Sequence, residues 1–415
     1  MLDIQFIRDN QELVARSCEQ KNVQVNLAEL LELDVERRTR LTQIDELRAR
    51  RNALAAEMKS ARPSEEQIAA GKQLKEDIVA RETDLTTIEE RYNDLMQSVP
   101  NVIPDDTPEG GEEANRPEKH WGEPRTDEVQ DHLTWGEAHD MIDFERGAKV
   151  AGAKFYYLKG DLVQLELAVF QYGLQLAAKY GFTPITVPHM VNTRTASGTG
   201  FLPRGEERQI YKIEGEDLNL IATAEIPITG YHADELLDEA DLPLLYVGLS
   251  PAYRMEAGAY GKHSKGLYRV HQFNKLEMYV FCKPEDSAAW HDKLMQLEEE
   301  LCQALEIPYQ VVRIAAGDLG GPAYKKYDIE YWSPVDQSYR ELMSCSNVTD
   351  YQARRLNIRY KNAEGKNTLV HTLNGTAAAY SRVAIALIEN HQTADDKVAV
   401  PQALQPFLGG KTHIG

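Results

Sequence analysis

The chain has 415 residues, of which 42% are hydrophobic and 27% charged, and its formal net charge is −20. This composition is typical of a soluble globular protein of two or three domains, and the acidic balance argues against a general nucleic-acid coat while allowing a local basic face. The first residues lack the basic start and apolar core of a signal peptide, and no apolar run approaches membrane-spanning length. We therefore expect a cytoplasmic protein without a membrane partner.

The cysteine and histidine pattern gives no sign of a zinc site. The four cysteines are too scattered to form a CxxC pair, so neither a zinc ribbon nor a disulfide framework is indicated. Free buried thiols in a reducing compartment are the expected state. The cysteines are Cys18, Cys282, Cys302 and Cys345.

The first hundred residues contain two heptad seams, in which the spacing alternates between four and three. Pro63 cannot continue the first helix, and Ser64 followed by Gln67 suits the N-terminal cap of a second one. We predict an antiparallel hairpin of two helices, Leu27–Ala61 and Ser64–Ser98, each roughly 50 Å long at ~1.5 Å per residue. The seam residues are Ile44, Leu47, Arg51, Leu54, Met58 and Ala61, then Leu74, Ile78, Arg81, Leu85, Ile88, Tyr92, Leu95 and Val99.

The sequence pattern of this arm leaves two interpretations open. A dimerisation coiled coil is the simpler one. The alternative uses the basic clusters Arg37–Arg40 and Arg48–Arg51, together with Lys72 and Lys75 on the second helix. Such clusters are usually a solvated face, but they can also contact a phosphate backbone.

The rest of the chain predicts an α+β fold. Residues 101–125 are rich in Pro, Gly and acidic side chains and read as a linker between an N-terminal domain (1–100, with the arm at about 27–98) and a domain over 126–415. Strand-like and helix-like segments mix there without a repeat, which favours an antiparallel sheet flanked by helices. The predicted strands are Phe155–Leu158, Phe182–Val187, Leu244–Tyr253 and Leu267–Phe281, and the predicted helices are Asp161–Lys179 and Ala288–Leu305.

The segment Tyr253–Tyr279, YRMEAGAYGKHSKGLYRVHQFNKLEMY, predicts a hairpin with Gly258–Gly266 as its loop. If Leu267–Phe281 is a strand, every second side chain shares one face, and Arg269 and Glu277 stand roughly 27 Å apart with an aromatic ring midway. An arginine fork suits phosphate or carboxylate, a ring can stack on a base, and a glutamate suits an ammonium group. The loop is not a Walker loop. A ribbon with structural ion pairs alone is the alternative.

This segment resembles motif 2 of the class II aminoacyl-tRNA synthetases. Residues 181–191 (GFTPITVPHMV) and 373–392 (LNGTAAAYSRVAIALIENHQ) resemble motifs 1 and 3. Three further segments, with the arm, are similar to the seryl-tRNA synthetases in particular: TAEIP (223–227), ELMSCSNVTDYQARRLNIRY (341–360) and GEEANRPEKHWGEP (111–124). The resemblance covers the whole chain. Motif 3 lacks a second glycine, and Met343 stands where a small or polar residue is common, but neither departure changes a motif arginine or an implied metal ligand.

The resemblance implies a set of ATP-binding residues. Arg254 is expected to hold the α-phosphate and the serine carboxylate, and Arg269 and Arg382 the outer phosphates. Phe273 and Arg382 are expected to enclose the adenine ring, with Glu256 near it. The implied ATP-binding residues are Arg254, Met255, Glu256, Arg269, Val270, Phe273, Glu341, Leu342, Met343, Ser344 and Arg382.

It also implies the serine and metal ligands. Glu341 and Ser344 are expected to ligate the Mg²⁺ that accompanies ATP, and no zinc is expected. The implied catalytic residues are Arg254, Arg382 and Glu277. The implied serine-binding residues are Thr223, Ala224, Glu225, Arg254, Glu277, Asn374 and Thr376.

The implied activity is that of a serine–tRNA ligase. The enzyme activates L-serine with ATP to seryl-adenylate and then transfers serine to the terminal adenosine of serine tRNA; whether selenocysteine tRNA is also charged stays open. The resemblance further implies a sheet of six or seven antiparallel strands, a homodimer formed through motif 1, and an arm that grips serine tRNA.

Three alternatives are weaker. A paralogue that makes aminoacyl-adenylate for another acceptor usually lacks the arm, and a class II enzyme for threonine or proline would not explain it. A non-catalytic coiled-coil protein would tend to lose the motif arginines, yet Arg254, Arg269 and Arg382 are all present.

Overall fold

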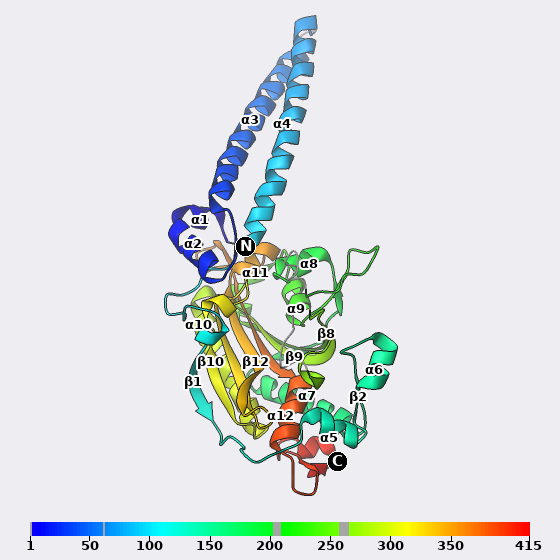
Figure 1. The fold of residues 1–415 in the computed structure, drawn as a ribbon. Coiled ribbons are helices and arrows are strands. Elements are labelled where there is room, and N and C mark those ends of the chain that lie inside the picture. Colours follow the sequence, from blue (N-terminus) through cyan, green and yellow to red (C-terminus); the bar gives the residue numbers. More distant parts are fainter. Residues whose placement is uncertain (1, 61–62, 202–208, 257–264) are drawn as a thin grey trace. The chain divides into compact units, whose positions relative to one another are not determined.

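The computed structural model describes residues 2–60, 63–201, 209–256 and 265–415 (Figure 1). It divides into two compact units, one up to Val102 and the other from Ile103 onward. The α-helices are α1 (Ile4–Asp9), α2 (Gln11–Gln20), α3 (Leu27–Ser60), α4 (Glu65–Ser98), α5 (His132–Ala138), α6 (Phe144–Ala151), α7 (Asp161–Lys179), α8 (Thr193–Gly198), α9 (Glu225–Tyr231), α10 (Ser287–Ala304), α11 (Tyr351–Leu356) and α12 (Tyr380–Asn390). The 3₁₀ helices are η1 (Glu112–Ala114), η3 (Glu239–Asp241), η4 (Gly266–Tyr268), η5 (Pro284–Asp286), η6 (Ala316–Asp318) and η7 (Gln405–Leu408).

The second unit holds all the strands of the described chain. They are β1 (Arg116–Trp121), β2 (Ile142–Asp143), β3 (Tyr157–Leu158), β4 (Thr183–Ile185), β5 (Met190–Val191), β6 (Asn219–Leu220), β7 (Leu236–Asp238), β8 (Leu244–Tyr253), β9 (Gln272–Cys282), β10 (Tyr309–Arg313), β11 (Lys325–Ser333), β12 (Ser338–Thr349), β13 (Arg359–Lys361), β14 (Asn367–Leu369), β15 (His371–Ala379), β16 (Val398–Ala399) and β17 (His413–Ile414).

The predicted helical hairpin is confirmed. Helices α3 and α4 lie side by side in Figure 1. Helix α4 begins with the predicted capping box: the Gln67 amide donates to Ser64 Oγ at 3.1 Å, and the Ser64 amide donates to Gln67 Oε1 at 3.0 Å. This reciprocal pair satisfies two backbone donors that the first turn of a helix otherwise leaves unpaired. Residue 61, the predicted last residue of the first helix, lies outside the described part of the chain.

The heptad seam is the contact line of the hairpin. Ile44 and Ile78 are buried in it, with exposed fractions of 2% and 4%. Of the two seam arginines, Arg81 donates across the hairpin to Gln43 Oε1 at 2.6 Å, whereas Arg51 is exposed. A polar bond inside an apolar seam favours one register over its neighbours.

Two arginines of the basic clusters form ion pairs across the arm. Arg37 Nε lies 3.0 Å from Glu89 Oε1, and Arg48 Nη2 lies 2.8 Å from Glu82 Oε1. Such exposed pairs add little stability, about 1 kcal/mol or less. Arg50 and Lys75 remain exposed at the surface.

The base of the arm packs on two short helices that the sequence pattern did not predict. Ile7 of α1 and Val14 of α2 are buried in one apolar cluster with Leu30, Met96 and Val99. Helices of six and ten residues are too short to show a clear 3.6-residue period, so their existence depends on this packing.

The second unit is built on an eight-stranded sheet in the order β1-β10-β11-β12-β15-β9-β8-β4. Seven of its strands pair antiparallel, as expected, but the edge strand β4 pairs parallel with β8, so the sheet is mixed and larger than the resemblance implied. Strands β10, β12, β9 and β8 are labelled in Figure 1. The predicted strand at Leu244–Tyr253 and helix at Asp161–Lys179 are confirmed to the residue.

The expected linker 101–125 needs a correction. Its residues Arg116–Trp121 form the other edge strand, β1, which pairs antiparallel with β10. Every residue of β1 is exposed, and Pro117 lies at a register shift, where a missing backbone N–H is tolerated. The pattern concealed the strand because an exposed edge strand has no apolar alternation.

The predicted strand Leu267–Phe281 starts later than expected, at Gln272. Gly266 has φ +63°, and a Cβ there would lie 2.1 Å from His132 Nε2, so only glycine fits this close approach. The Leu267 amide donates to the same His132 Nε2 at 3.2 Å and begins η4. Arg269 and His271 therefore precede the strand, and the alternation of side chains on one face begins only at Phe273.

Helices cover the two faces of the sheet differently. Leu276 and Met278 of β9 belong to the large apolar cluster that α7, α10 and α12 cover. On the opposite face, Tyr279 and Phe281 pack with α9 and α11, for example with Leu356. The remainder of that second face carries the predicted site residues.

In the described ranges, we find no helix with the length and apolar character needed to span a membrane.

Candidate functional site

The predicted site residues converge on one face of the sheet. Strand β9 contributes Glu277, strand β15 contributes Thr376 directly opposite it in register, and β8 leads into Arg254 one residue after its end. Arg382 follows from the first turn of α12, and Glu341 from β12. Segments more than a hundred residues apart in sequence thus meet at one place.

A β-bulge explains how Glu341 and Ser344 share a face. Positions three apart on a regular strand point to opposite faces. Here Glu330 pairs with Glu341 and Ile329 with Met343, so Leu342 is an extra residue on β12. The bulge shifts the alternation by one and turns both oxygen ligands to the same side. Leu342 and Met343 are fully buried in the apolar cluster, so only their backbones can face ATP.

A second bulge lies on β15. Thr376 pairs with Glu277 and Ala378 with Leu276, which leaves Ala377 unpaired on β15. Before this bulge, the side chains of Asn374 and Thr376 point to the face of the sheet that carries the site. Gly375 between them faces the other side, toward α10.

A buried carboxylate pair forms the serine side of the predicted site. Asn374 Nδ2 donates to Glu225 Oε1 at 3.0 Å, and the Glu225 amide donates to Thr223 Oγ1 at 3.3 Å. Glu277, 1% exposed, forms an ion pair with Lys275 two residues before it on β9. Ala224, the other predicted residue here, has a fully buried side chain.

Burial and mutual charge shift the pKa values of these acids upward. Burial raises the pKa of Glu225 to about 7, and the charge of Glu277 adds to the effect, while hydrogen bonds from Gln352 and Asn374 oppose it. Burial also raises the pKa of Glu277, although Lys275 partly offsets it. Two buried carboxylates whose charges act on each other are suited to receive a cation.

The half-buried Arg254 guanidinium is held beside this carboxylate pair. Its backbone N–H donates to the His271 carbonyl at 3.0 Å, and His271 Nδ1 returns a bond to the Arg254 carbonyl at 2.9 Å. Arg254 Nε donates to the Ala222 carbonyl at 3.4 Å, and Cζ lies 5.3 Å from the centre of the Phe273 ring. Burial lowers the pKa of Arg254, and Arg382 lowers it further, but an arginine stays charged.

Arg382 and Glu341 form the second charged group. Arg382 Nη1 lies 2.9 Å from Glu341 Oε1. Burial alone would raise the pKa of Glu341, but Arg382 and Lys326 outweigh it and lower the pKa to about 2. This carboxylate is therefore ionised, and with an exposed fraction of 36% its side chain is accessible to a ligand.

Tyr268 is a site residue that the sequence did not indicate. Both Arg382 and Arg340 lie over its ring, with Cζ atoms 5.0 and 5.4 Å from the ring centre. In a strand, Tyr268 would have faced away from Arg269. Its place in η4 turns the ring toward the arginines, and no local pattern predicts that turn.

At the predicted adenine end of the site, the structure brings two of the predicted residues together. Arg269 Nη1 lies 3.4 Å from Glu256 Oε2, which brings these two predicted residues together. Phe273 has the Arg254 guanidinium over its ring, and Arg382 lies over Tyr268, so the enclosure of adenine by Phe273 and Arg382 stays a prediction.

Two further residues predicted to contact ATP lie in the same part of the chain. Met255 is exposed and Val270 is buried, so their predicted contacts with ATP stay predictions. Residues 257–264, most of the predicted loop, lie outside the described part of the chain.

The described residues contain no group of three or more His, Cys, Asp or Glu side chains arranged to hold a metal ion. The predicted Mg²⁺ site is of a different kind, because its two protein ligands are one glutamate and one serine. Glu341 and Ser344 supply the hard oxygen donors that Mg²⁺ prefers, and Mg²⁺ commonly completes its shell with phosphate and water. The residues present therefore fit a magnesium ion that arrives with ATP.

Comparisons with known proteins match the chain over its full length. Residues 1–103 match the model of the seryl-tRNA synthetase N-terminal domain, and residues 210–391 match the class II synthetase core domain for G, H, P, S and T. The serine–tRNA ligase of Dictyoglomus thermophilum is 45% identical over 417 aligned positions, covering 99% of this chain and 98% of that protein. The chain belongs to the seryl-tRNA synthetase family.

Further relatives agree with this family. The serine–tRNA ligase of Rhodopirellula baltica is 46% identical, with 99% of this chain and 98% of that protein covered. The crystal structure of seryl-tRNA synthetase from Pyrococcus horikoshii complexed with ATP superposes with a TM-score of 0.90 at 40% identity, covering 100% of this chain and 99% of that one. As a seryl-tRNA synthetase family member, the chain is an aminoacyl-tRNA synthetase, a class of ligases. The N-terminal match argues against the threonine and proline alternatives.

Proposed function

We propose that this chain activates L-serine with ATP and transfers it to the terminal adenosine of serine tRNA. One observation carries the proposal: a buried acidic pair and two arginines meet at one face of the sheet. Glu225 and Glu277 suit the ammonium and hydroxyl groups of serine, while Arg254 and Arg382 suit its carboxylate and the phosphates of ATP.

We also propose that the reaction takes place in the cytoplasm. The four cysteines are buried and free, which fits a reducing compartment. Cell fractionation tests this proposal.

The chemistry follows from charge placement. The serine carboxylate attacks the α-phosphorus of ATP, pyrophosphate leaves, and negative charge grows on the phosphoryl oxygens. Arg254 would stabilise that charge and orient the nucleophile. No protein base is needed, because the serine carboxylate is itself the nucleophile. Glu341 and Ser344 would hold Mg²⁺, which supplies further charge neutralisation when bound.

Serine selectivity would come from the hydroxyl pocket. Thr376 faces Glu277 across the β9–β15 pair, and both can bond the serine hydroxyl. Alanine would leave these buried groups unpaired and bind poorly, whereas threonine has to be excluded by lack of space.

The test is amino-acid-dependent ATP–pyrophosphate exchange with each standard amino acid, followed by charging of serine tRNA. We expect exchange with serine alone, abolished by EDTA and restored by Mg²⁺. Exchange with a different amino acid would refute the assignment of the pocket, and no exchange from folded protein would favour a non-catalytic role.

We expect the affinity for serine to fall as the pH drops through about 7. Serine keeps its ammonium charge over this range, so it needs Glu225 as the carboxylate. Below the raised pKa of about 7, Glu225 in the empty enzyme is protonated, and the KM for serine should rise by up to about tenfold per pH unit. The measurement is KM for serine in the exchange assay from pH 8.5 to 5.5.

The matched control for this pH profile is Glu225→Gln. This variant should have a high KM for serine at every pH and a flat profile, because the titrating group is gone. The KM for ATP follows the titration of ATP itself and should change equally in both proteins. Identical serine profiles for the two proteins would exclude Glu225 as the titrating group.

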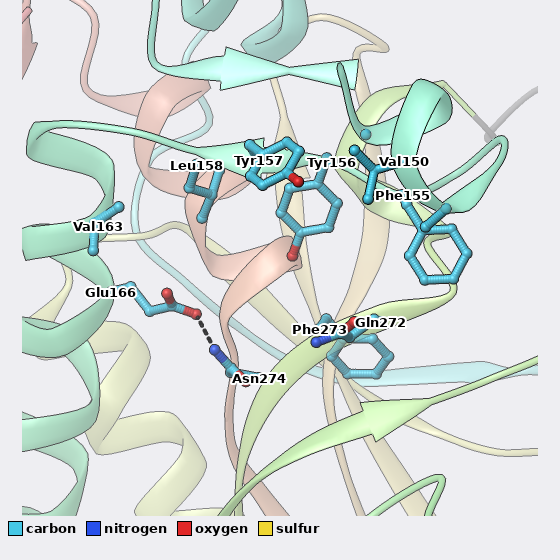
Figure 2. Close-up of a pocket in the computed structure, with 12 residues that line it drawn as sticks. Val150, Phe155, Tyr156, Tyr157, Leu158, Val163, Glu166, Gln272, Phe273 and Asn274 are labelled. Atoms are coloured by element: carbon cyan, nitrogen blue, oxygen red, sulfur yellow. Dashed lines mark hydrogen bonds between the residues drawn. The ribbon is translucent and has the colours of Figure 1, made fainter. Parts of the chain in front are cut away.

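We further propose that the chain forms a homodimer through motif 1 and that a second copy covers the apolar side chains that are exposed on α6, β3 and α7 beside the pocket of Figure 2. A pocket of about 410 Å³ opens there, and its wall includes Glu166, which accepts a 3.0 Å bond from Asn274. Large apolar side chains stay exposed around it, on α6, β3 and α7: Val150 (69%), Tyr157 (45%), Val163 (37%) and Leu167 (56%). Such a patch is typical of an interface.

Light scattering tests the homodimer. We expect the mass of two chains for the wild type and of one chain for Leu167→Glu, because a charge on this exposed face of α7 would be buried unpaired in the interface. A wild type that stays monomeric at micromolar concentration would contradict the proposal.

We also propose that the helical arm binds serine tRNA, mainly through its backbone and shape. The match of residues 1–103 to a domain model specific to seryl-tRNA synthetases supports this role over a dimerisation coiled coil. The exposed Arg50 and Lys75 are available for phosphate contacts.

A further inference from the structure

The serine side of the site rests on a buried chain of hydrogen bonds centred on Gln352 of α11. This side chain is completely buried. Its Nε2 donates to Glu225 Oε1 at 2.7 Å and to the Thr199 carbonyl at 3.2 Å. Its Oε1 accepts from the Tyr279 hydroxyl at 2.7 Å and from Thr372 Oγ1 at 2.9 Å.

These four partners fix the orientation of the amide. A carbonyl and a carboxylate can only accept hydrogen bonds, so both require the NH₂ side of Gln352. An amide turned by 180° would place its oxygen against these two acceptors in a buried site, where such a contact is costly. The two hydroxyl donors on the other side favour the same orientation.

The hydroxyl side of this network is itself anchored. Tyr279 is fully buried on β9, and the Thr229 hydroxyl lies 2.6 Å from the Tyr279 hydroxyl and 2.7 Å from the Glu225 carbonyl. The network therefore ties α9, β9, β15 and α11 together behind Glu225. A group held from several elements loses little further freedom when a ligand binds.

We propose that Gln352 is a positioning residue for serine recognition, whose locked amide holds the Glu225 carboxylate in one orientation toward the ammonium group of serine. The inference rests on the proposed function, because it takes Glu225 as the group that meets serine. Gln352 itself would not touch the substrate. Together with Asn374, it gives Glu225 Oε1 two N–H donors, at 2.7 and 3.0 Å.

The test is the split between KM and kcat in serine-dependent ATP–pyrophosphate exchange. Gln352→Met keeps the length of the side chain and removes the donor, so the KM for serine should rise about 10- to 100-fold, the range for a bond to a charged group. The KM for ATP and kcat at saturating serine should stay within about twofold. Loss of general stability would not produce this split.

A second variant tests the orientation mechanism. Thr372→Val removes one donor on the far side of the amide and leaves Gln352 and Glu225 in place, so we expect a smaller rise in the serine KM, about threefold. In the double variant, Thr372→Val should add nothing to Gln352→Met, because there is no amide left to orient. If the two substitutions damaged the structure independently, their fold-increases in the serine KM would instead multiply.

Gln310→Met is the matched control. Gln310 is also buried and donates to a carboxylate, Glu330 Oε2, at 2.6 Å, but it lies on β10 and has no contact with the serine pocket. It should leave the serine KM unchanged at a comparable melting temperature.

Several outcomes would overturn the inference. A folded Gln352→Met with the wild-type serine KM would do so, as would an equal rise in the KM for ATP. If Gln352→Met does not fold, Thr372→Val decides, and a wild-type serine KM in that variant overturns the inference. A wild type without serine-dependent exchange would refute the proposed function itself, which distinguishes the two failures.

Discussion

Replacement of Arg254 by alanine should reduce serine-dependent ATP–pyrophosphate exchange about 1,000-fold or more. The Arg254 guanidinium lies over the Phe273 ring beside the acidic pair, and its backbone is held by two bonds to His271. Removal of a single preorganised donor commonly costs about 100- to 1,000-fold in rate. Arg254 would serve both the serine carboxylate and the α-phosphate, which places the expected loss at the upper end.

Two further variants sharpen this prediction. Arg254→Lys keeps the charge but loses the planar fork, so it should recover only a small part of the activity. Arg125→Ala is the matched control, because Arg125 also donates to backbone carbonyls, those of Asn390 and Gln392 at 3.1 and 2.8 Å, away from the site. Its exchange rate should stay within about twofold of the wild type. An Arg254→Ala enzyme with more than a tenth of the wild-type exchange would disprove the role.

Deletion of residues 43–85, with the helix stubs rejoined by a short Gly-Ser linker, should abolish tRNA charging and leave adenylate formation intact. The cross-hairpin contacts Arg81–Gln43 and Arg37–Glu89 show that the two helices are adjacent at the cut. The catalytic residues all belong to the other compact unit, so the exchange reaction should keep its rate within about twofold. Charging should fall at least about 1,000-fold, because many phosphate and shape contacts would be lost together.

The exchange assay is the internal control for this deletion, since it uses the same protein sample and the same active site. Charging should also fall in the full-length protein as salt concentration rises, if phosphate contacts carry part of the binding. Equal loss of exchange and charging in the deletion variant would show that the arm supports the catalytic unit. Unchanged charging would favour the dimerisation coiled coil.

The sequence alone determined the elements that rest on local periodicity. The hairpin of α3 and α4 follows from its heptad seams and from the Ser64–Gln67 cap, because both are set by residues within a few turns of each other. Helix α7 and strand β8 were predicted to the residue for the same reason. The alternation of β9 from Phe273 to Phe281 was also readable, since a regular strand repeats every two residues. The resemblance of the motifs then indicated the site residues as a set.

Only the tertiary structure decided where strands shift register and which side chains meet. The bulge at Leu342, which brings Glu341 and Ser344 to one face, depends on pairing with β11. The late start of β9 depends on His132, which lies 135 positions before Leu267. Likewise, β1 is a strand only because β10 pairs with it.

The hydrogen bonds around Gln352 behind the serine pocket were likewise decided only by the tertiary structure. Gln352 is bonded to partners from β9, β15 and α9, and its neighbours along the chain give no sign of that environment. Local sequence encodes propensity and periodicity, whereas these features depend on hydrogen bonds between segments that folding brings together.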